Sequence, residues 1–370
     1  MRTSPAFGEQ QNLQALSSSG CLKLLYMSHL ALGDYIYQGA FLKALTHSYP
    51  NIQLDVWIDD CRSKKKSWHA GRSQALVQWL SSEPHINYTY PIANNRSDLE
   101  DIIHQAHMED YDVIVFVATS RTPEFAKIAL NISQQGKVFG TIPSNKFGRL
   151  IHYSIYKKLD GKINLHKTTE YDHITDFYQD IFQQFFAISI NQNQRVLKLN
   201  ISGQLEAKLT SKIDAWAKKY HLTYPKVIFV NHLSTNSKRN WKLRQVEEFI
   251  LLMGAKFPQS LFILNAPPNE FQSLKYWTNN NPRVKHLAIE VFTAKNDFFE
   301  LPCLMSLCNL VITVETSIMH LASSLNIKQI ALIRQSAKHW RPQNNSLVLQ
   351  GHQRVDTIEA QEVFNAVVNL

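Results

Sequence analysis

Residues 310–325 read LVITVETSIMHLASSL, and this stretch decides the fold. Its first five residues, Leu310–Val314, form a short apolar run that is typical of a strand covered on both faces. Glu315 and Thr316 then interrupt the run, and Ser317–Leu325 continues with the spacing of a helix. A buried strand followed at once by a helix is the repeating unit of a parallel sheet, so the stretch predicts an α/β protein.

The same alternation extends along the chain. Strands are predicted at Leu22–Met27, Leu54–Ile58, Val113–Val117, Val138–Thr141, Val227–Val230, Leu261–Leu264, Val284–Ile289 and Gln329–Ile333. Helical patterns separate them, whereas Ser144–Lys167 is basic, aromatic and loop-like. Two Rossmann-like halves of about 200 and about 150 residues are therefore expected, with a boundary between Asn191 and Pro225.

Composition narrows the class of protein. The 370 residues include 39 Lys and Arg against 30 Asp and Glu, which gives a net charge of +9. A hydrophobic content of 44% supports packed cores and excludes global disorder. With 12 Gly and 4 Cys, collagen and disulfide scaffolds are excluded as well. The charge favours an anionic ligand, a nucleic acid or an acidic membrane surface as partner.

The apolar runs and the cysteines favour the cytoplasm. The apolar runs are far shorter than the roughly 20 residues that cross a bilayer. Residues 1–20 are polar, lack the apolar core of a secretory signal and are predicted to form a flexible tail. Cys303 and Cys308 lie in an apolar helical stretch without the spacing of zinc ligands, so buried, reduced thiols are expected.

Two turns that follow predicted strands carry candidate chemistry, because ligands of open α/β sheets bind at the carboxyl ends of the strands. The first is residues 28–34, SHLALGD, where Gly33 permits close backbone approach or a positive φ. Asp34 begins a helix, whose dipole keeps its carboxylate ionised as a general base requires; a helix cap is the alternative. No dinucleotide-binding glycine fingerprint is present.

The second turn is residues 315–320. The hydroxyls and N–H groups of Thr316 and Ser317 stand at a helix N-terminus, where an anion binds readily. Glu315 would repel a diphosphate, so sugar hydroxyls are its expected partners. His320 lies one turn into the helix on the same face as Thr316 and could donate to a phosphate. The alternative is a helix cap with a buried histidine.

A third cluster, residues 231–241, follows the strand Val227–Val230 and reads NHLSTNSKRNW. Its hydroxyls, amides and the adjacent cations Lys238 and Arg239 suit phosphate oxygens, which an arginine binds with two N–H groups. A solvated polar loop is the alternative.

These three segments resemble the ADP-heptose:lipopolysaccharide heptosyltransferases, glycosyltransferase family 9, and the resemblance runs from about Lys23 to Leu370. Residues 28–34 look like the family's Ser-x-Gly-Asp turn, and 238–241 look like its Lys-x-Trp-Pro element. Residues 314–322, VETSIMHLA, look like the Asp-Thr-Gly-x-x-His-Leu-Ala donor motif. Glu315 and Ser317 depart from that motif, Lys242 replaces the proline, and residues 334–336, RQS, replace a Gly-Pro-Thr turn. The fold and reaction type are therefore better predicted than the donor sugar.

The resemblance implies an α/β fold of the GT-B type, in which two Rossmann-like domains with parallel sheets face a central cleft. The tail would be residues 1–20, the acceptor-binding domain 21–200, the nucleotide-sugar-binding domain 201–354 and the closing helix 355–370. The implied enzyme is an inverting, metal-independent glycosyltransferase that moves heptose from ADP-heptose to the inner core of lipopolysaccharide. It would need no cofactor and no metal, and the chain has no Asp-x-Asp motif. It would work in the cytoplasm, in possible contact with the inner membrane surface.

Site residues follow from the same resemblance. Asp34 would be the base that deprotonates the acceptor hydroxyl. Donor-binding residues would be Ser234, Lys238, Arg239, Glu315, Thr316, Ser317 and His320. Acceptor-binding residues would be Gly33, Arg62, Lys64, Lys65 and Arg121. The basic and aromatic residues of 146–158 would suit an anionic glycolipid at a membrane surface.

Four other interpretations stay open at this point. The enzyme could use another nucleotide sugar, such as a hexose or N-acetylhexosamine donor. The charge of +9 also fits a nucleic-acid-binding protein, although no signature of one is present. A nicotinamide-dependent oxidoreductase is disfavoured by the missing glycine fingerprint. A non-catalytic partner in envelope synthesis would follow if the donor site were inactive.

Overall fold

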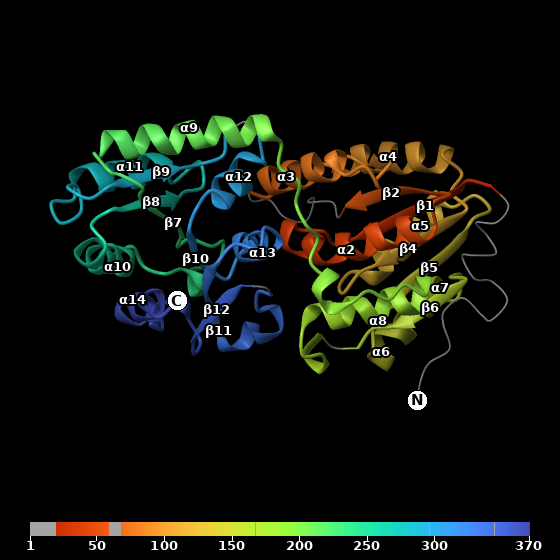
Figure 1. The fold of residues 1–370 in the computed structure, drawn as a ribbon. Helices are drawn as coiled ribbons and strands as arrows, with labels where there is room; N and C mark the ends of the chain where they lie inside the picture. The colour runs from red at the N-terminus through yellow and green to blue at the C-terminus, as the bar shows by residue number, and fades with distance from the viewer. Residues whose placement is uncertain (1–19, 59–67, 167, 296, 344) are drawn as a thin grey trace. The chain divides into compact units, whose positions relative to one another are not determined.

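The computed structural model describes residues 20–58, 68–166, 168–295, 297–343 and 345–370 (Figure 1). The chain divides into two compact units, Met1–Leu197 and Lys198–Leu370. Each unit is built around its own six-stranded sheet, and every strand pair in both sheets is parallel. Arg62, Lys64 and Lys65 lie outside the described residues.

The sheet of the first unit has the strand order β3-β2-β1-β4-β5-β6. Its strands are β1 (Leu22–Ser28), β2 (Ile52–Ile58), β3 (Tyr88–Thr89), β4 (Val113–Val117), β5 (Lys137–Ile142) and β6 (Gly161–Asn164). Its helices are α2 (Leu32–Ser48), α3 (Trp68–Ser82), α4 (Arg96–Met108), α5 (Thr122–Ile132), α6 (Lys146–Ile151), α7 (Tyr153–Tyr156) and α8 (Ile174–Phe186), with the short 3-10 helices η1 (Thr168–Glu170) and η2 (Gln192–Gln194).

Alternating side chains of β1 show why this sheet is covered on both faces. Leu25 and Met27 belong to the core that α4 and α5 close. Tyr26 points the other way, with its ring centroid 5.8 Å from that of Phe182 on α8. Phe182 in turn stacks on Phe41 of α2, at 5.0 Å between centroids. The strands β1 and β4 are almost entirely buried, and burial on both faces explains why every residue of β4 is apolar.

The sheet of the second unit has the order β12-β11-β10-β7-β8-β9. Its strands are β7 (Lys226–Asn231), β8 (Ser260–Asn265), β9 (Ile289–Phe292), β10 (Leu310–Val314), β11 (Gln329–Arg334) and β12 (Ser346–Gly351). Its helices are α9 (Gly203–Lys219), α10 (Leu243–Lys256), α11 (Phe271–Asn280), α12 (Glu300–Ser306), α13 (Ser317–Ser324) and α14 (Ala360–Val368), with 3-10 helices η3 (Ser237–Arg239), η4 (Gln335–Trp340) and η5 (Val355–Thr357).

Both sheets have the doubly wound order, in which the direction of winding reverses at the middle of the sheet. The reversal lies between β1 and β4 in the first unit and between β7 and β10 in the second. The turns that leave these four strands flank a natural ligand site. They contain Asp34, Arg121, the 231–241 cluster and the 315–320 turn, so the topology gathers the sequence candidates in pairs within each unit.

Three sequence predictions differ from the structure. The strand expected at Val284–Ile289 begins only at Ile289, as β9. The stretch Ser144–Lys167, expected to be a loop, contains α6, α7 and β6. The strands β3, β6 and β12 were not predicted, since they are short or carry exposed and half-buried residues at sheet edges.

Several residues of the C-terminal segment belong to the second unit's core. Val355, Ile358 and Val363 are buried in the same apolar cluster as residues of β7, β10 and α10.

In the described part of the chain, no helix is long and apolar enough to cross a membrane. The described residues also include no group of His, Cys, Asp and Glu that could hold a metal ion.

Candidate functional site

Asp34 is the third residue of α2, at the carboxyl end of β1. Its Oδ2 accepts a hydrogen bond from the Ala31 N–H at 3.1 Å, and the side chain is half-buried. The N-cap residue is Ala31, so Asp34 is not the N-cap that the sequence offered as the alternative; its bond to the Ala31 N–H is half of a capping box and fixes the carboxylate at the positive end of the helix dipole. Gly33 lies within α2 and has no positive φ, since among the described glycines only Gly20 has one.

A buried polar network lies below this turn. The Tyr26 hydroxyl donates to Oε1 of Gln38 at 2.6 Å, and Nε2 of Gln38 donates to the Tyr178 hydroxyl at 3.1 Å. The Ser28 hydroxyl lies 2.9 Å from the same Gln38 Oε1 and 2.8 Å from the Val117 carbonyl oxygen. Burial raises the pKa of Tyr26 and Tyr178 far above the usual range, and the negative charge of Asp34 raises both further. These hydroxyls therefore stay protonated and add no negative charge near the carboxylate.

Arg121 joins the turns that follow β1 and β4. It has a left-handed backbone, with φ 52°, at the start of α5. Its Nη2 lies 3.3 Å from Nδ1 of His29, and the Nε2 of His29 lies 2.6 Å from the Ser120 carbonyl oxygen. A carbonyl oxygen only accepts and a guanidinium only donates, so Nε2 donates and Nδ1 accepts. The structure thus places the predicted acceptor-binding cation Arg121 in the turn beside the one that contains Asp34.

In the second unit, Glu315 follows β10 and is buried. Its carboxylate accepts two hydrogen bonds from the guanidinium of Arg334, from Nε at 3.0 Å and from Nη2 at 2.8 Å. The backbone N–H of Arg334 donates a third bond, at 3.3 Å. Nε of Arg239 lies 3.2 Å from Oε1 of the same carboxylate. This Nε is buried and forms an ion pair without an aligned hydrogen bond.

Arg239, Glu315 and Arg334 form an arginine cluster, and its charge alters the role expected for the Glu315 carboxylate. One negative and two positive side chains carry a net charge of +1. The protein partners of Glu315 are therefore guanidinium groups, whereas the sequence suggested sugar hydroxyls as its partners. Because the cluster is positive, the expected repulsion between Glu315 and a diphosphate no longer applies. The ion pair with Glu315 raises the pKa of Arg334, which stays charged.

Thr316 and the start of α13 are fixed by a chain of side-chain amides. The Thr316 hydroxyl accepts from the Ile318 N–H at 3.3 Å, which caps the helix, and from Nδ2 of Asn231 at 3.1 Å. Asn265 then donates to Oδ1 of Asn231 at 2.9 Å. The carboxyl ends of β8, β7 and β10 are thereby tied together, which holds the helix N-terminus and half-buried Ser317 rigidly in place.

His320 and the residues after β7 complete the candidates. His320 is buried, with its ring edge to face against Trp340 at 6.1 Å between centroids. The Ser234 N–H donates to Oδ1 of Asn240 at 2.7 Å, which folds the loop back on itself. Lys238 is exposed on η3, beside half-buried Arg239. The second unit therefore brings Arg239, Glu315 and Thr316 to one edge of its sheet, where the sequence expected them.

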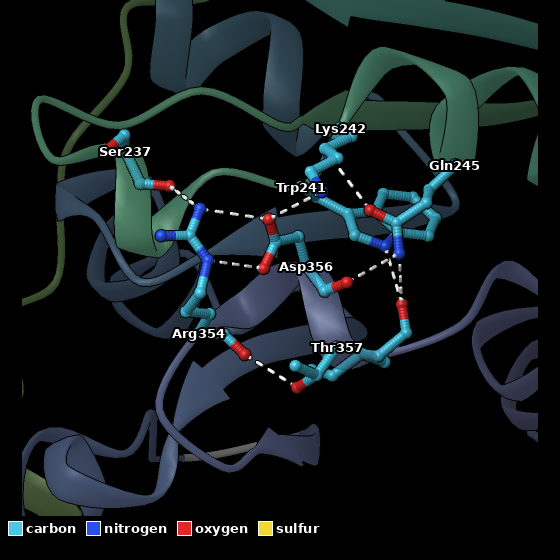
Figure 2. Close-up of polar contacts among 8 residues, drawn as sticks. Ser237, Trp241, Lys242, Gln245, Arg354, Asp356 and Thr357 are labelled. Carbon is cyan, nitrogen blue, oxygen red and sulfur yellow. Dashed lines mark hydrogen bonds and ion pairs between the residues drawn. The ribbon is translucent and has the colours of Figure 1, made fainter.

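Figure 2 shows how η3 is held. Nε and Nη2 of Arg354 donate to the two oxygens of Asp356 at 2.9 and 3.0 Å, and Nη2 also donates to the Ser237 carbonyl oxygen at 3.4 Å. Nζ of Lys242 pairs with Asp356 at 3.2 Å. The buried indole of Trp241 donates to the Ile358 carbonyl oxygen at 2.9 Å. These contacts anchor the cations of η3 to the C-terminal segment.

Two residues of this edge were not predicted as site residues. Arg334 ends β11, and the sequence marked it only as part of residues 334–336, which replace a turn of the family. His232 follows β7, and burial lowers its pKa to about 4, so its imidazole is neutral. Nδ1 of His232 is buried, and no described residue forms a hydrogen bond with it.

Comparisons with known proteins agree with this architecture. The family model described as glycosyltransferase family 9 (heptosyltransferase) matches residues 156–365. A glycosyltransferase family 9 structure from Veillonella parvula is similar over 95% of this chain and 97% of its own, with TM-score 0.72 and 16% identity. No curated protein sequence matches.

Two Escherichia coli structures are also similar. The ADP-heptose LPS heptosyltransferase II has TM-score 0.68 and 15% identity, over 94% of this chain and 98% of its own. The heptosyltransferase WaaC with ADP-2-deoxy-2-fluoro heptose has TM-score 0.64 and 13% identity, over 94% and 99%. At these identities the likeness establishes the fold, and it confirms the expected GT-B heptosyltransferase fold.

Proposed function

The chain belongs to glycosyltransferase family 9 and is a glycosyltransferase, and from that premise we propose that it transfers heptose from ADP-heptose to a hydroxyl of the lipopolysaccharide inner core. The observation that carries the proposal is the arginine cluster. It sets a net charge of +1 beside a helix N-terminus, at the point where the strand order of the second sheet reverses. A diphosphate suits such a site, because guanidinium groups and helix N–H groups both bind phosphate oxygens.

The proposed reaction is a single inverting displacement. A carboxylate oxygen of Asp34 takes the proton of the acceptor hydroxyl, and that oxygen bonds to the anomeric carbon of the sugar. The bond from this carbon to the diphosphate breaks, and its electron pair leaves with ADP. Arg239, Lys238 and His320, with the N–H groups at the start of α13, would stabilise the growing negative charge of the leaving group. Positive side chains would then do the work that a metal does in other transferases.

The remaining donor and acceptor residues have supporting roles in this proposal. Ser234 and Ser317 would bind the nucleotide sugar, with Thr316 fixing the helix that carries Ser317. Arg121 would bind an anionic group of the acceptor, and Gly33 would leave room for the acceptor beside Asp34. The acceptor is an anionic glycolipid, so the enzyme would work at the cytoplasmic face of the inner membrane.

The direct experiment is a transfer assay read by mass. The purified protein is incubated with ADP-heptose and heptose-deficient lipopolysaccharide, with and without a chelator. We expect the acceptor to gain the mass of one heptose, and the chelator to change nothing. An acceptor of unchanged mass, with active control enzyme in a parallel tube, would contradict the proposal.

One observation favours a second candidate, a transferase of the same family that uses another nucleotide sugar. Glu315 is longer by one methylene than the aspartate of the family motif, and its carboxylate is already paired with Arg239 and Arg334. In this candidate a different set of groups binds the sugar. A panel of ADP- and UDP-linked sugars in the same assay distinguishes the two candidates, since only one donor should give a product.

A further inference from the structure

Four large apolar side chains stand exposed within seven residues of the first unit. The exposed fractions are 74% for Phe147, 73% for Leu150, 57% for Ile151 and 62% for Tyr153. The first three follow the spacing i, i+3, i+4 on α6, so they share one face of that helix. Since α6 has no buried residue, the rest of the described structure does not cover this face.

The residues that follow α6 are anchored in the core of the first unit. Tyr156 of α7 is buried in the core of the first unit, and its hydroxyl lies 2.7 Å from the hydroxyl of Thr122. Leu159 is buried in the same core. Asn145 caps α6 by accepting from the Gly148 N–H. The apolar face of α6 is therefore displayed by a fixed element.

Positive charge flanks these apolar residues along the chain. Residues 125–159 contain no Asp and no Glu, whereas they include six cations. Four of them flank the apolar face: Lys146, Arg149, Lys157 and Lys158. Three of these four are exposed, and the fourth, Arg149, is half-buried. Apolar side chains rimmed by cations match a bilayer with anionic headgroups, because the apolar groups enter the interface while the cations meet phosphates.

The position of the segment fits the proposed acceptor. It follows the carboxyl end of β5, and carboxyl ends of parallel strands lie at the same edge of a sheet. Asp34 and Arg121 follow β1 and β4 at that edge. We propose that Phe147, Leu150, Ile151 and Tyr153, with their flanking cations, form a docking surface for an anionic phospholipid bilayer. This surface rests on the proposed function only in that a bilayer would present the glycolipid acceptor.

Co-sedimentation of the full chain with vesicles tests the surface without any nucleotide sugar. The protein should bind vesicles that contain phosphatidylglycerol far more tightly than vesicles of pure phosphatidylcholine, and binding should weaken as salt is raised. The double variant Phe147→Ser/Leu150→Ser should bind at least about tenfold more weakly. Lys157→Gln/Lys158→Gln should bind roughly 25-fold more weakly, at about fivefold for each cation.

The matched controls are Tyr224→Ser and Tyr276→Ser, which remove aromatic side chains 96% and 71% exposed in the second unit. They should bind vesicles like the parent protein. Equal binding by Phe147→Ser/Leu150→Ser would overturn the proposal. So would a parent protein that ignores headgroup charge, or one in which this double variant merely converts a dimer to a monomer in sedimentation velocity.

Turnover on two acceptors separates this proposal from the proposed function. The variant Phe147→Ser/Leu150→Ser should lose activity on an acceptor embedded in vesicles and keep it on the same core sugar freed of its acyl chains. Equal loss on both acceptors would mean that the surface acts on folding or chemistry, and the docking proposal would fail. If the parent protein transfers no heptose at all, the proposed function fails, while the vesicle binding still decides the docking surface.

Discussion

In each unit a candidate carboxylate follows a strand at which the direction of winding reverses, and the two carboxylates have different partners. Asp34 accepts a hydrogen bond from the Ala31 backbone N–H, and its charge raises the pKa of the buried Tyr26 and Tyr178 hydroxyls, which stay protonated. Glu315 is enclosed by the guanidinium groups of Arg239 and Arg334. Corresponding places in two doubly wound sheets thus hold one carboxylate that accepts from the backbone at the start of its helix and one that pairs with two guanidinium groups. In the proposed mechanism the first accepts a proton, whereas the second holds cations in place.

The sharpest way to break this comparison is Asp34→Asn. The amide keeps the shape and can still accept from Ala31, but it cannot take a proton, so kcat should fall by about 10²–10⁴-fold. Asp98→Asn is the matched control, since Asp98 is likewise the third residue of its helix, α4, and caps it by accepting from the Asn94 N–H. Its turnover should match that of the parent protein. Full turnover by Asp34→Asn would remove Asp34 from the mechanism.

Arg239→Ala should have the next largest effect. Loss of a charge-assisted contact to the diphosphate should lower kcat/KM for the donor by roughly 10- to 100-fold. Arg244→Ala, an exposed change five residues along the chain, is the control for lost positive charge. The cluster would have no part in donor binding if both variants had the same kcat/KM.

Glu315→Gln tests whether this carboxylate is a scaffold. The change removes the charge that pairs with two guanidinium groups, and we expect a loss of about 1–2 kcal/mol in the free energy of unfolding, since both arginines are partly exposed to solvent. Denaturant unfolding measures it. In the double variant Glu315→Gln/Arg334→Gln the further loss should be small, because the pair is already broken. Strictly additive losses would show that the two side chains do not interact.

The smallest expected effect concerns Asp356, which holds η3. Hydrogen bonds from Arg354 and then Lys242 keep its pKa below the usual 3.8. Its contribution is therefore complete above about pH 4 and is lost as the pH falls below that, through the pKa of the folded state. Asp356→Asn should cost about 1 kcal/mol at neutral pH and flatten the stability profile on the acid side. The prediction would be contradicted if, between pH 2 and pH 7, the free energy of unfolding of Asp356→Asn fell with decreasing pH as steeply as that of the parent protein.

Residues that lie close in sequence could be predicted, and pairings between distant strands could not. The run Leu310–Val314 and the turn at Asp34 predict their elements by pattern alone, and α2 begins at Leu32, two residues before Asp34, which the sequence placed at the start of a helix. The bond from Arg334 to Glu315 spans 19 residues and depends on the parallel register that sets Val314 beside Leu332. The register between two strands cannot be predicted from the residue pattern of either strand alone.

The docking segment shows a second limit. Residues 144–167 lack an apolar stripe long enough to predict a helix that packs on a core, because no residue of α6 is buried in the part of the unit that the structure describes. The sequence therefore indicated a loop, although it correctly marked the segment as basic and aromatic. Short edge strands such as β6 fail for a related reason, since half of their residues face solvent.

Calorimetric titration of ADP into the parent protein, Asp34→Asn and Arg239→Ala tests the division of roles most directly. We expect Asp34→Asn to bind ADP with the affinity of the parent, and Arg239→Ala to bind at least about tenfold more weakly, since only the arginine would face the diphosphate. Weakened binding by Asp34→Asn together with unchanged binding by Arg239→Ala would contradict the account.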